Sequence, residues 1–320
     1  MTEQNHAQIV FVYGALRSGT TAFRLMLDAH PDTANPGEYD FLFDHLRRDH
    51  THATGWRVDL DALQSDRIFS SSGLTLPRQN VPLDGLDLIH AFFDQLRARA
   101  PEARVITLNV HRNGRRIHDA LPDAKFIHLI RDPRDVARSS IPMGWAAHIY
   151  YGVDHWIETE RDWGMISTLI QPENQFELRY ESLFSDWETE LKLVCDFLNV
   201  PWSPLMLTYH EHTSYAAPDP KLIEQWRQKC STDALALLEG KVGDLMNARG
   251  YVCATTPRTP TRSERITLAA NHKIYRWRFG TQAYGPVLFF GEKVSRRIGL
   301  RGVHRRITAQ ISDLHKHSLK

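Results

Sequence analysis

The stretch from residue 9 to residue 21, IVFVYGALRSGTT, decides the fold. Its first five residues are β-branched or aromatic and end at a glycine, which is typical of a buried parallel strand. Gly14 and Gly19 then bracket a short loop, and residues 20–29 show helical spacing of apolar side chains up to the His30-Pro31 pair. A strand, a glycine loop and a helix form an anion cradle, because the loop amides and the positive end of the helix dipole converge on one point.

The loop departs from a nucleotide-triphosphate P-loop at one position. Its glycines have the G-x-x-x-x-G spacing, but Thr20 stands where that motif needs lysine, and the positive charge comes three residues earlier, at Arg17. The sequence therefore predicts that the loop holds a phosphate-like group without the usual Mg-nucleotide arrangement. An ordinary strand, turn and helix without a ligand is the alternative.

Composition indicates a soluble globular protein long enough for a large core. The chain has 320 residues, of which 42% are hydrophobic and 24% charged. We see no apolar run close to the ~20 residues that span a bilayer, and the polar N-terminus lacks the apolar core of a signal peptide. The three cysteines are widely spaced, which favours reduced thiols and a cytoplasmic location.

Charge is distributed unevenly along the chain. Residues 255–320 contain fourteen Lys or Arg against three Asp or Glu, whereas the whole chain has a net charge of +1. We expect a boundary here, with a main domain at residues 1–254 and a basic helical extension at residues 255–320. Two interpretations of the extension stand equal: it contacts an anionic membrane surface, or it packs on the acidic main domain.

Three further segments predict strands, at residues 104–110, 125–130 and 176–180, with helical stretches between them. This order predicts an α/β fold of three layers, a P-loop-like parallel sheet covered by helices on both faces. Ligands of such sheets bind beyond the carboxyl ends of the strands. Arg17, Glu38, His111 and Arg131 all fall at or near such ends, although each alone also fits a structural role: a solvated loop acid for Glu38, a hydrogen-bonded histidine for His111, and a charged, capped helix start for residues 131–140.

These motifs together resemble the sulfotransferase family that uses 3′-phosphoadenosine 5′-phosphosulfate (PAPS). Residues 14–21 followed by Asp28-Ala-His-Pro31 resemble its 5′-phosphosulfate loop, and Pro36-Gly-Glu38 resembles the acidic segment of its bacterial and carbohydrate-type branches. Residues 131–139 resemble the 3′-phosphate motif. Residues 179–183 and 195–201 resemble two later family segments, so that the resemblance covers about residues 9–254.

The resemblance implies a role for each site residue. The donor would be held at its 5′ end by Arg17, Ser18, Gly19, Thr20 and Thr21, at its 3′-phosphate by Arg131 and Ser139, and at its adenine by Tyr180, with the product PAP leaving without a metal. Glu38 and His111 compete as the base that takes the proton of an acceptor hydroxyl or amine, and Glu38 is favoured. The acceptor would be a carbohydrate, a glycolipid or a small molecule, and a lipid-linked acceptor would suit an enzyme peripheral to the membrane.

Two departures from the family stand out. Many members have Lys-Thr-His where this chain has Asn109-Val110-His111, so the role of the lysine passes to Arg17 or Arg112, or is absent. The family's C-terminal Arg-Lys-Gly element has no clear match, and Lys221 and Arg227 are the candidate substitutes.

Two other functions are weighed against sulfuryl transfer. A kinase with a degenerate P-loop is opposed by Thr20, and a nucleic-acid binder using the basic extension would leave the Arg17 loop and the Arg131/Ser139 pair unexplained. His45, His50 and His52 lack the fixed spacing of a metal site. The identity of the acceptor cannot be predicted from the sequence.

Overall fold

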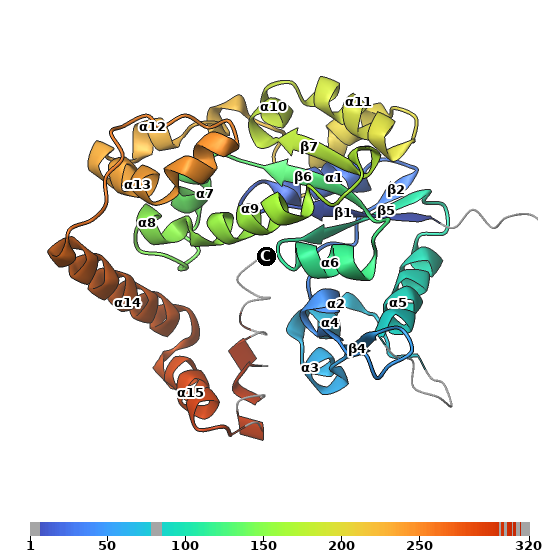
Figure 1. The fold of residues 1–320 in the computed structure, drawn as a ribbon, viewed down its shortest axis with the longest axis horizontal. Coiled ribbons are helices and arrows are strands. Elements are labelled where there is room, and N and C mark those ends of the chain that lie inside the picture. Colours follow the sequence, from blue (N-terminus) through green and yellow to red (C-terminus); the bar gives the residue numbers. More distant parts are fainter. Residues whose placement is uncertain are drawn as a thin grey trace, which may run out of the picture.

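The computed structural model of the chain describes residues 7–77, 85–300, 302–303, 306–308, 310–311 and 314. At its centre is a five-stranded parallel sheet in the order β2-β5-β1-β6-β7 (Figure 1). The strands are β1 (Gln8–Tyr13), β2 (Thr33–Ala34), β5 (Val105–Val110), β6 (Lys125–Ile130) and β7 (Gln175–Arg179). The predicted parallel sheet is confirmed, and the strand quoted first from the sequence lies in its middle.

Alternate side chains of β1 build the two cores that flank the sheet. Phe11 and Tyr13 enter one cluster, which packs against α2 (Phe41–Asp44), α5 (Gly85–Arg99) and α6 (Gly114–Ala120). Val10 and Val12 enter the other, against α1 (Thr20–Asp28), α10 (Tyr180–Ser185) and α11 (Trp187–Leu198). Because successive residues of a strand point to opposite faces, one apolar strand supplies both cores, and the predicted three-layer α/β fold is confirmed.

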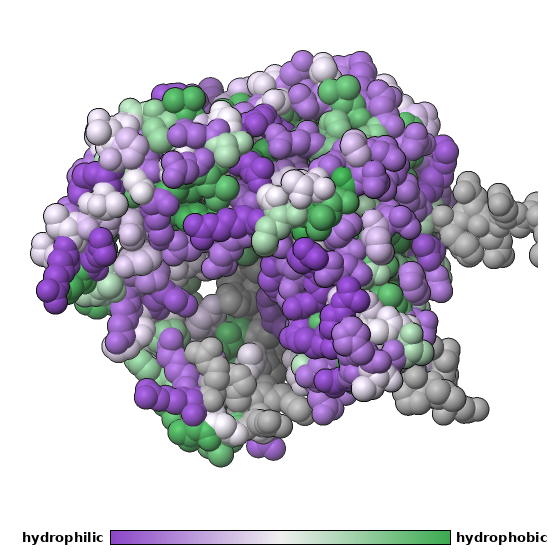
Figure 2. All heavy atoms as spheres, in the orientation of Figure 1, coloured by the Kyte–Doolittle hydropathy of each residue, from purple (hydrophilic) through white to green (hydrophobic). Residues whose placement is uncertain are grey.

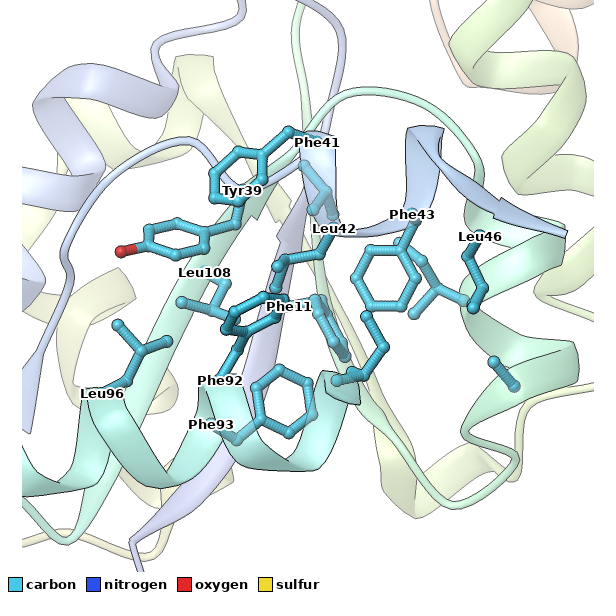
Figure 3. Packing of buried hydrophobic residues seen from close by; sticks show 14 of the residues in the cluster. Phe11, Tyr39, Phe41, Leu42, Phe43, Leu46, Phe92, Phe93, Leu96 and Leu108 are labelled. Carbon is cyan, nitrogen blue, oxygen red and sulfur yellow. The ribbon is translucent and has the colours of Figure 1, made fainter. Parts of the chain in front are cut away.

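Aromatic rings fill the first of these cores. The ring of Phe11 lies edge-on to Phe43 at 5.6 Å between centroids, and Phe92 and Phe93 extend from α5 into the same cluster (Figure 3). These rings are all but fully buried. Burial of this kind contributes about 25 cal/mol per Å² of apolar surface, so this cluster fixes the position of the chain that leads to Glu38.

A third cluster supports the helices that follow β6. It packs α7 (Pro133–Ser139) between α8 (Ile149–Gly152), α9 (Asp154–Ile166) and α13 (Thr232–Ala248). Asp132 caps α7 by accepting a hydrogen bond from the Arg134 amide, and Pro133 is the first helical residue, as the sequence predicts.

The residue pattern predicts that residues 41–100 are mostly helical and that residues 221–227 form a helix, and the structure corrects both predictions. In the first segment, Leu46–Arg48 (β3) and Trp56–Val58 (β4) pair as an antiparallel hairpin between α2 and the helices α3 (Leu60–Gln64) and α4 (Arg67–Ser72). Residues 221–227 do not form one helix. They divide between the 3-10 turn η3 (Pro220–Leu222) and α12 (Trp226–Lys229), because Glu224 between them takes a left-handed conformation with φ 53°. The 3-10 turns η1 (Pro172–Asn174) and η2 (Pro204–Glu211) complete this part of the fold.

The chain ends in two helices at the side of the sheet domain, α14 (Arg262–Tyr284) and α15 (Pro286–Arg297) (Figure 1). Thr261 and Glu264 form a capping box at the start of α14. The division at residue 254 stays a prediction, as does the cytoplasmic location. Within the described part of the chain, no helix is long and apolar enough to cross a membrane.

Candidate active site

The glycine loop joins β1 to α1 and is shaped by close backbone contacts. A side chain at Gly14 would collide with the carbonyl oxygen of Leu129 on β6, so the loop can only leave the sheet at this point with glycine. Gly19 begins α1 with φ 93°, provides no side-chain cap, and is followed by a first turn without acidic residues. The positive end of α1 therefore faces the loop without a compensating carboxylate, which is the arrangement that binds anions.

Ser18 is placed differently from its neighbours. Its amide donates to the Ala15 carbonyl, and its hydroxyl is fully buried with no hydrogen-bond partner among the described residues. Thr20 is also buried, whereas Thr21 is half-buried at the loop. In this conformation the Ser18 side chain faces the interior, and the donor-binding role assigned to Ser18 stays a prediction.

The loop directly contacts the end of α7. Arg17 has a left-handed backbone with φ 73°, and its Nε donates to the Ser139 hydroxyl at 3.0 Å. The Arg131 guanidinium donates to the Arg17 carbonyl at 3.2 Å. The structure thus brings together Arg17, Arg131 and Ser139. Each of the two contacts joins Arg17 to a residue more than 110 positions further along the chain.

This contact brings the positive charges of the exposed Arg17 and the buried Arg131 close together. Burial lowers the pKa of Arg17, and the positive charge of Arg131 acts in the same direction. Arg131 is 8% exposed, and its Nε has no hydrogen-bond partner among the described residues. A buried donor without a partner is destabilising, so an anion bound here would relieve both the unpaired donor and the repulsion.

Tyr180 links the loop to Arg131. Its ring lies under the Arg131 guanidinium at 3.7 Å and stacks on Phe184 with centroids 4.0 Å apart. On its edge it touches Gly19, where an added Cβ would lie 2.5 Å from the ring. Tyr180 therefore holds Arg131 and the start of α1 in one arrangement, and the adenine contact assigned to it stays a prediction.

Glu38 and His111 face each other from two neighbouring segments of the chain. Glu38 forms an isolated parallel bridge with Asn109, and His111 follows directly after β5. The His111 Nδ1 donates to the Gly14 carbonyl at 2.8 Å, because a carbonyl can only accept. The other ring nitrogen, Nε2, lies 3.7 Å from the Glu38 carboxylate.

The two groups shift each other's proton affinity. The nearby imidazole of His111 and its positive charge when protonated hold the pKa of Glu38 below its usual value, against the opposing effect of burial. Burial opposes the charged form of His111, but Glu38 and the buried Asp40 together raise the pKa of His111 above its usual value. The two shifts favour the ion pair of a Glu38 carboxylate with a His111 imidazolium over the neutral pair.

The structure also locates the substitutes considered for the missing family elements. Asn109 is buried and donates to the Thr20 carbonyl, so it supports the loop rather than offering a charge. Arg112 is held by Asp44, and Arg227 by Glu224 at 2.7 Å. Lys221 precedes Leu222, whose carbonyl accepts from Arg131, so its backbone lies at the site.

Three supporting residues carried no signal in the sequence. His155 donates to the Leu16 carbonyl at 2.9 Å and fixes the loop from α9, and the Trp156 indole donates to the Arg131 carbonyl at 3.0 Å. Leu222 contributes its carbonyl. His155 and Trp156 lie in an aromatic-rich stretch of sequence that is typical of ordinary core. The contact made by Leu222 uses its backbone carbonyl, which every residue has, so no residue pattern predicts it.

The fold and the site define an α/β protein with a cluster of arginines and a glycine loop at the carboxyl end of a parallel sheet. The profile of the sulfotransferase family matches residues 9–204. A candidate protein-tyrosine sulfotransferase of Caenorhabditis briggsae is 31% identical over 217 residues, which cover 65% of this chain and 71% of that protein. The protein-tyrosine sulfotransferase of Drosophila melanogaster is 25% identical over 217 residues, covering 63% of this chain and 40% of the fly protein.

A solved structure, the sulfotransferase domain of the Synechococcus PCC 7002 olefin synthase, shares the fold. It superimposes with a TM-score of 0.53 at 20% identity, covering 78% of this chain and 97% of that domain. Because the family profile matches more than half of the chain, the chain belongs to the sulfotransferase family and is an enzyme of that class. This membership favours sulfuryl transfer over the kinase and nucleic-acid alternatives.

Proposed function

We propose that this enzyme transfers a sulfuryl group from PAPS to an acceptor hydroxyl, with release of adenosine 3′,5′-bisphosphate. The observation that carries the proposal is the contact of the glycine loop with the 131–139 segment, through Arg17 and Ser139 at 3.0 Å. A nucleotide with phosphates at its 3′ and 5′ positions needs two anion sites close together. The unpartnered Nε of Arg131 and the uncompensated start of α1 fit such a ligand.

The position of each residue assigns it to one end of the donor. Arg17 and the amides at the start of α1 would bind the 5′ end and stabilise the negative charge that develops on the leaving side. Arg131 and Ser139 would bind the 3′-phosphate and govern donor affinity. PAPS itself supplies an activated sulfuryl group, and no metal ligand is needed for that chemistry. Among the described residues no cluster of three His, Cys, Asp or Glu side chains could hold a metal ion.

We propose Glu38 as the base. Its lowered pKa keeps it ionised near neutral pH, and its carboxylate is about half exposed, so an acceptor can reach it. His111 is buried and fixed through Nδ1 beside Glu38, and Glu38 raises its pKa, so it would act by orienting Glu38 and, when protonated, by offering positive charge to the transferring group. This assignment predicts that Glu38→Gln abolishes turnover, whereas His111→Ala leaves a measurable rate.

The acceptor is proposed as a hydroxyl in the first place and an amine in the second. The relatives named above are protein-tyrosine sulfotransferases, and a further relative of 26% identity is a mycobacterial sulfotransferase of an omega-hydroxylated menaquinone. All of these names describe hydroxyl acceptors. A carbohydrate, glycolipid or small-molecule hydroxyl stays within the proposal, because the residues described around Glu38 do not select among them.

The test begins with calorimetric titration of the full chain with adenosine 3′,5′-bisphosphate. We expect the wild type to bind with micromolar affinity. Arg131→Met should weaken this affinity at least tenfold, because it removes a charge-assisted hydrogen-bonding group. Arg104→Met is the matched control, because Arg104 is exposed at the amino end of β5, on the opposite edge of the sheet. A wild-type chain that binds Mg-ATP but not the bisphosphate would contradict the proposal.

A second step identifies the acceptor. Radiolabelled PAPS is incubated with tyrosine peptides, sugars, glycolipids and small alcohols, and transfer is measured for the wild type, Glu38→Gln and His111→Ala. Loss of transfer in Glu38→Gln with retention of bisphosphate binding supports the assignment of Glu38 as base. Retained turnover in Glu38→Gln with loss in His111→Ala would reverse the two roles.

A further inference from the structure

Among the described residues, one face of helix α14 contacts the 141–151 segment of the sheet domain. The His272 ring accepts from the Ala147 amide and stacks near Tyr151, and the Tyr275 hydroxyl donates to the Ile141 carbonyl at 2.7 Å. Phe279 lies over Gly144, where any side chain would collide with its ring. Since residues three and four apart share a helix face, His272, Tyr275 and Phe279 define the attached side of α14.

The opposite face of α14 is apolar and exposed. Ile266 is 65% exposed, Ile274 53% and Trp277 41%, and their spacing places them on one side of the helix, turned away from the attached side. None of the three is needed to hold α14 on the domain. An exposed stripe of large apolar residues on a helix is the usual sign of a surface that meets another apolar phase.

Helix α15 continues this surface. Val287, Phe290, Val294 and Ile298 recur at intervals of three and four residues and are 82%, 42%, 56% and 61% exposed. The two stripes meet where the Trp277 and Phe290 rings pack edge to face, with centroids 6.0 Å apart. Together the stripes form one surface, here called the α14–α15 apolar face; its members are Ile266, Ile274, Trp277, Val287, Phe290, Val294 and Ile298.

Positive charges border the α14–α15 apolar face. Lys273 lies over the Trp277 ring at 4.9 Å, and Lys293 lies over Phe289 at 4.7 Å, next to the exposed Arg297. Figure 2 shows apolar side chains at the outer end of α15, with strongly hydrophilic ones beside them. The segment from residue 255 onward has fourteen Lys or Arg against three Asp or Glu, so positive charge predominates in the segment that carries this face.

We propose that the α14–α15 apolar face docks on an anionic lipid membrane, with its aromatic and aliphatic side chains at the level of the headgroups. An anionic bilayer satisfies both features at once, since it accepts apolar side chains and attracts the bordering Lys and Arg. Trp277 occupies the position of an interfacial aromatic anchor. A second copy of the same face would bring like charges together, which makes it a poor occupant.

This docking is independent of the donor site, and its test uses no activity measurement. The full chain is sedimented with vesicles of phosphatidylcholine alone or with phosphatidylserine added. We expect binding to the anionic vesicles that falls with salt, and weak binding to neutral ones. Lys293→Gln with Arg297→Gln should weaken partitioning about thirtyfold, because each basic residue near the surface contributes roughly fivefold.

The apolar contribution is tested by Val294→Glu with Ile298→Glu, which should reduce binding more than tenfold. The matched control is Met165→Glu with Leu193→Glu, two exposed apolar residues of 57% and 46% exposure on helices of the sheet domain, which should leave binding unchanged. Trp277→Phe should remove the fluorescence blue shift on vesicle binding. Circular dichroism confirms that each variant is folded.

Three results would overturn the proposal. The wild type could fail to bind anionic vesicles at low salt, or it could bind them equally after the Val294 and Ile298 substitutions. The wild type could also be a dimer that those substitutions dissociate, without binding vesicles, in which case a second copy covers the face.

Discussion

Replacing Gly19 by alanine is the sharpest test of how the donor loop is held. Gly19 begins α1 with φ 93°, a conformation that residues with a side chain rarely adopt. The added Cβ would lie 2.5 Å from Cδ2 of Tyr180, whose ring supports the Arg131 guanidinium at 3.7 Å. The methyl group must therefore displace either the start of α1 or the ring beneath Arg131.

Both consequences can be given a magnitude. The left-handed backbone costs a non-glycine residue about 1–2 kcal/mol, and forcing a ring aside in a packed region costs about 1–3 kcal/mol. We expect Gly19→Ala to lower the free energy of unfolding by about 2–5 kcal/mol. Displacement of Arg131 should also weaken its charge-assisted contact with a phosphate, which is ~1.5–3 kcal/mol, or at least tenfold in affinity.

Denaturant unfolding and calorimetric titration with adenosine 3′,5′-bisphosphate measure the two effects. Gly55→Ala is the control, since Gly55 also has a left-handed backbone, with φ 71°, but no atom lies within 4 Å of an added Cβ. It should lose only the backbone contribution and keep its affinity. The reasoning is refuted if Gly19→Ala is no less stable than Gly55→Ala and binds the bisphosphate as the wild type does.

Three further predictions concern single contacts. Glu38→Gln should lower the free energy of unfolding by up to about 1 kcal/mol, mainly between about pH 5 and 6. The lowered pKa of Glu38 contributes stability above its usual value of 4.5, and this contribution is lost as pH falls. The raised pKa of His111 contributes stability below its usual value of 6.5, and this contribution is lost as pH rises. Unfolding curves at pH 5.5 and pH 9 measure this, and an equal loss at both would contradict it. Ser139→Ala should weaken bisphosphate binding about two- to tenfold in calorimetry and leave turnover at saturating donor unchanged, because one neutral hydrogen bond is removed; a lower saturated rate would give Ser139 a part in the chemistry. Asp162→Ala should cost about 1–3 kcal/mol in denaturant unfolding, since its carboxylate accepts from the buried Tyr13 hydroxyl at 2.7 Å; adding Tyr13→Phe should restore part of the loss, and no restoration would disprove the pairing.

The sheet could be predicted because its signal is local. Residues 125–130 are predicted as a strand and form β6 with the same bounds, since Phe126, Ile127, Leu129 and Ile130 are apolar on both faces of a parallel sheet. The β3–β4 hairpin could not be predicted in the same way. Each of its strands has three residues, and Leu46 continues the helical spacing of Leu42 and Phe43, so the local pattern favoured a helix.

The site could be predicted only in part, because its decisive contacts join distant segments. Arg17 and Ser139 are 122 residues apart, and their contact followed only from the rule that ligands bind at the carboxyl ends of parallel strands. The burial of the Ser18 hydroxyl and the left-handed backbone at Arg17 beside it have no signature in the sequence. Motif spacing thus predicted which segments of the chain come together, but it did not predict the orientation of each side chain.

The two arginines that open the 131–139 segment show this limit most clearly. In sequence Arg131 and Arg134 look equivalent, since each is followed by an aspartate. In the fold, Arg134 lies between Asp132 at 2.7 Å and Glu239 at 3.0 Å, so its charge is fully compensated and it can only support structure. Arg131 instead donates to two backbone carbonyls and keeps an unpartnered Nε among the described residues. Glu239, 105 residues further along the chain, makes the difference, because it supplies the second carboxylate to Arg134, whereas the guanidinium of Arg131 receives no such carboxylate hydrogen bond among the described residues.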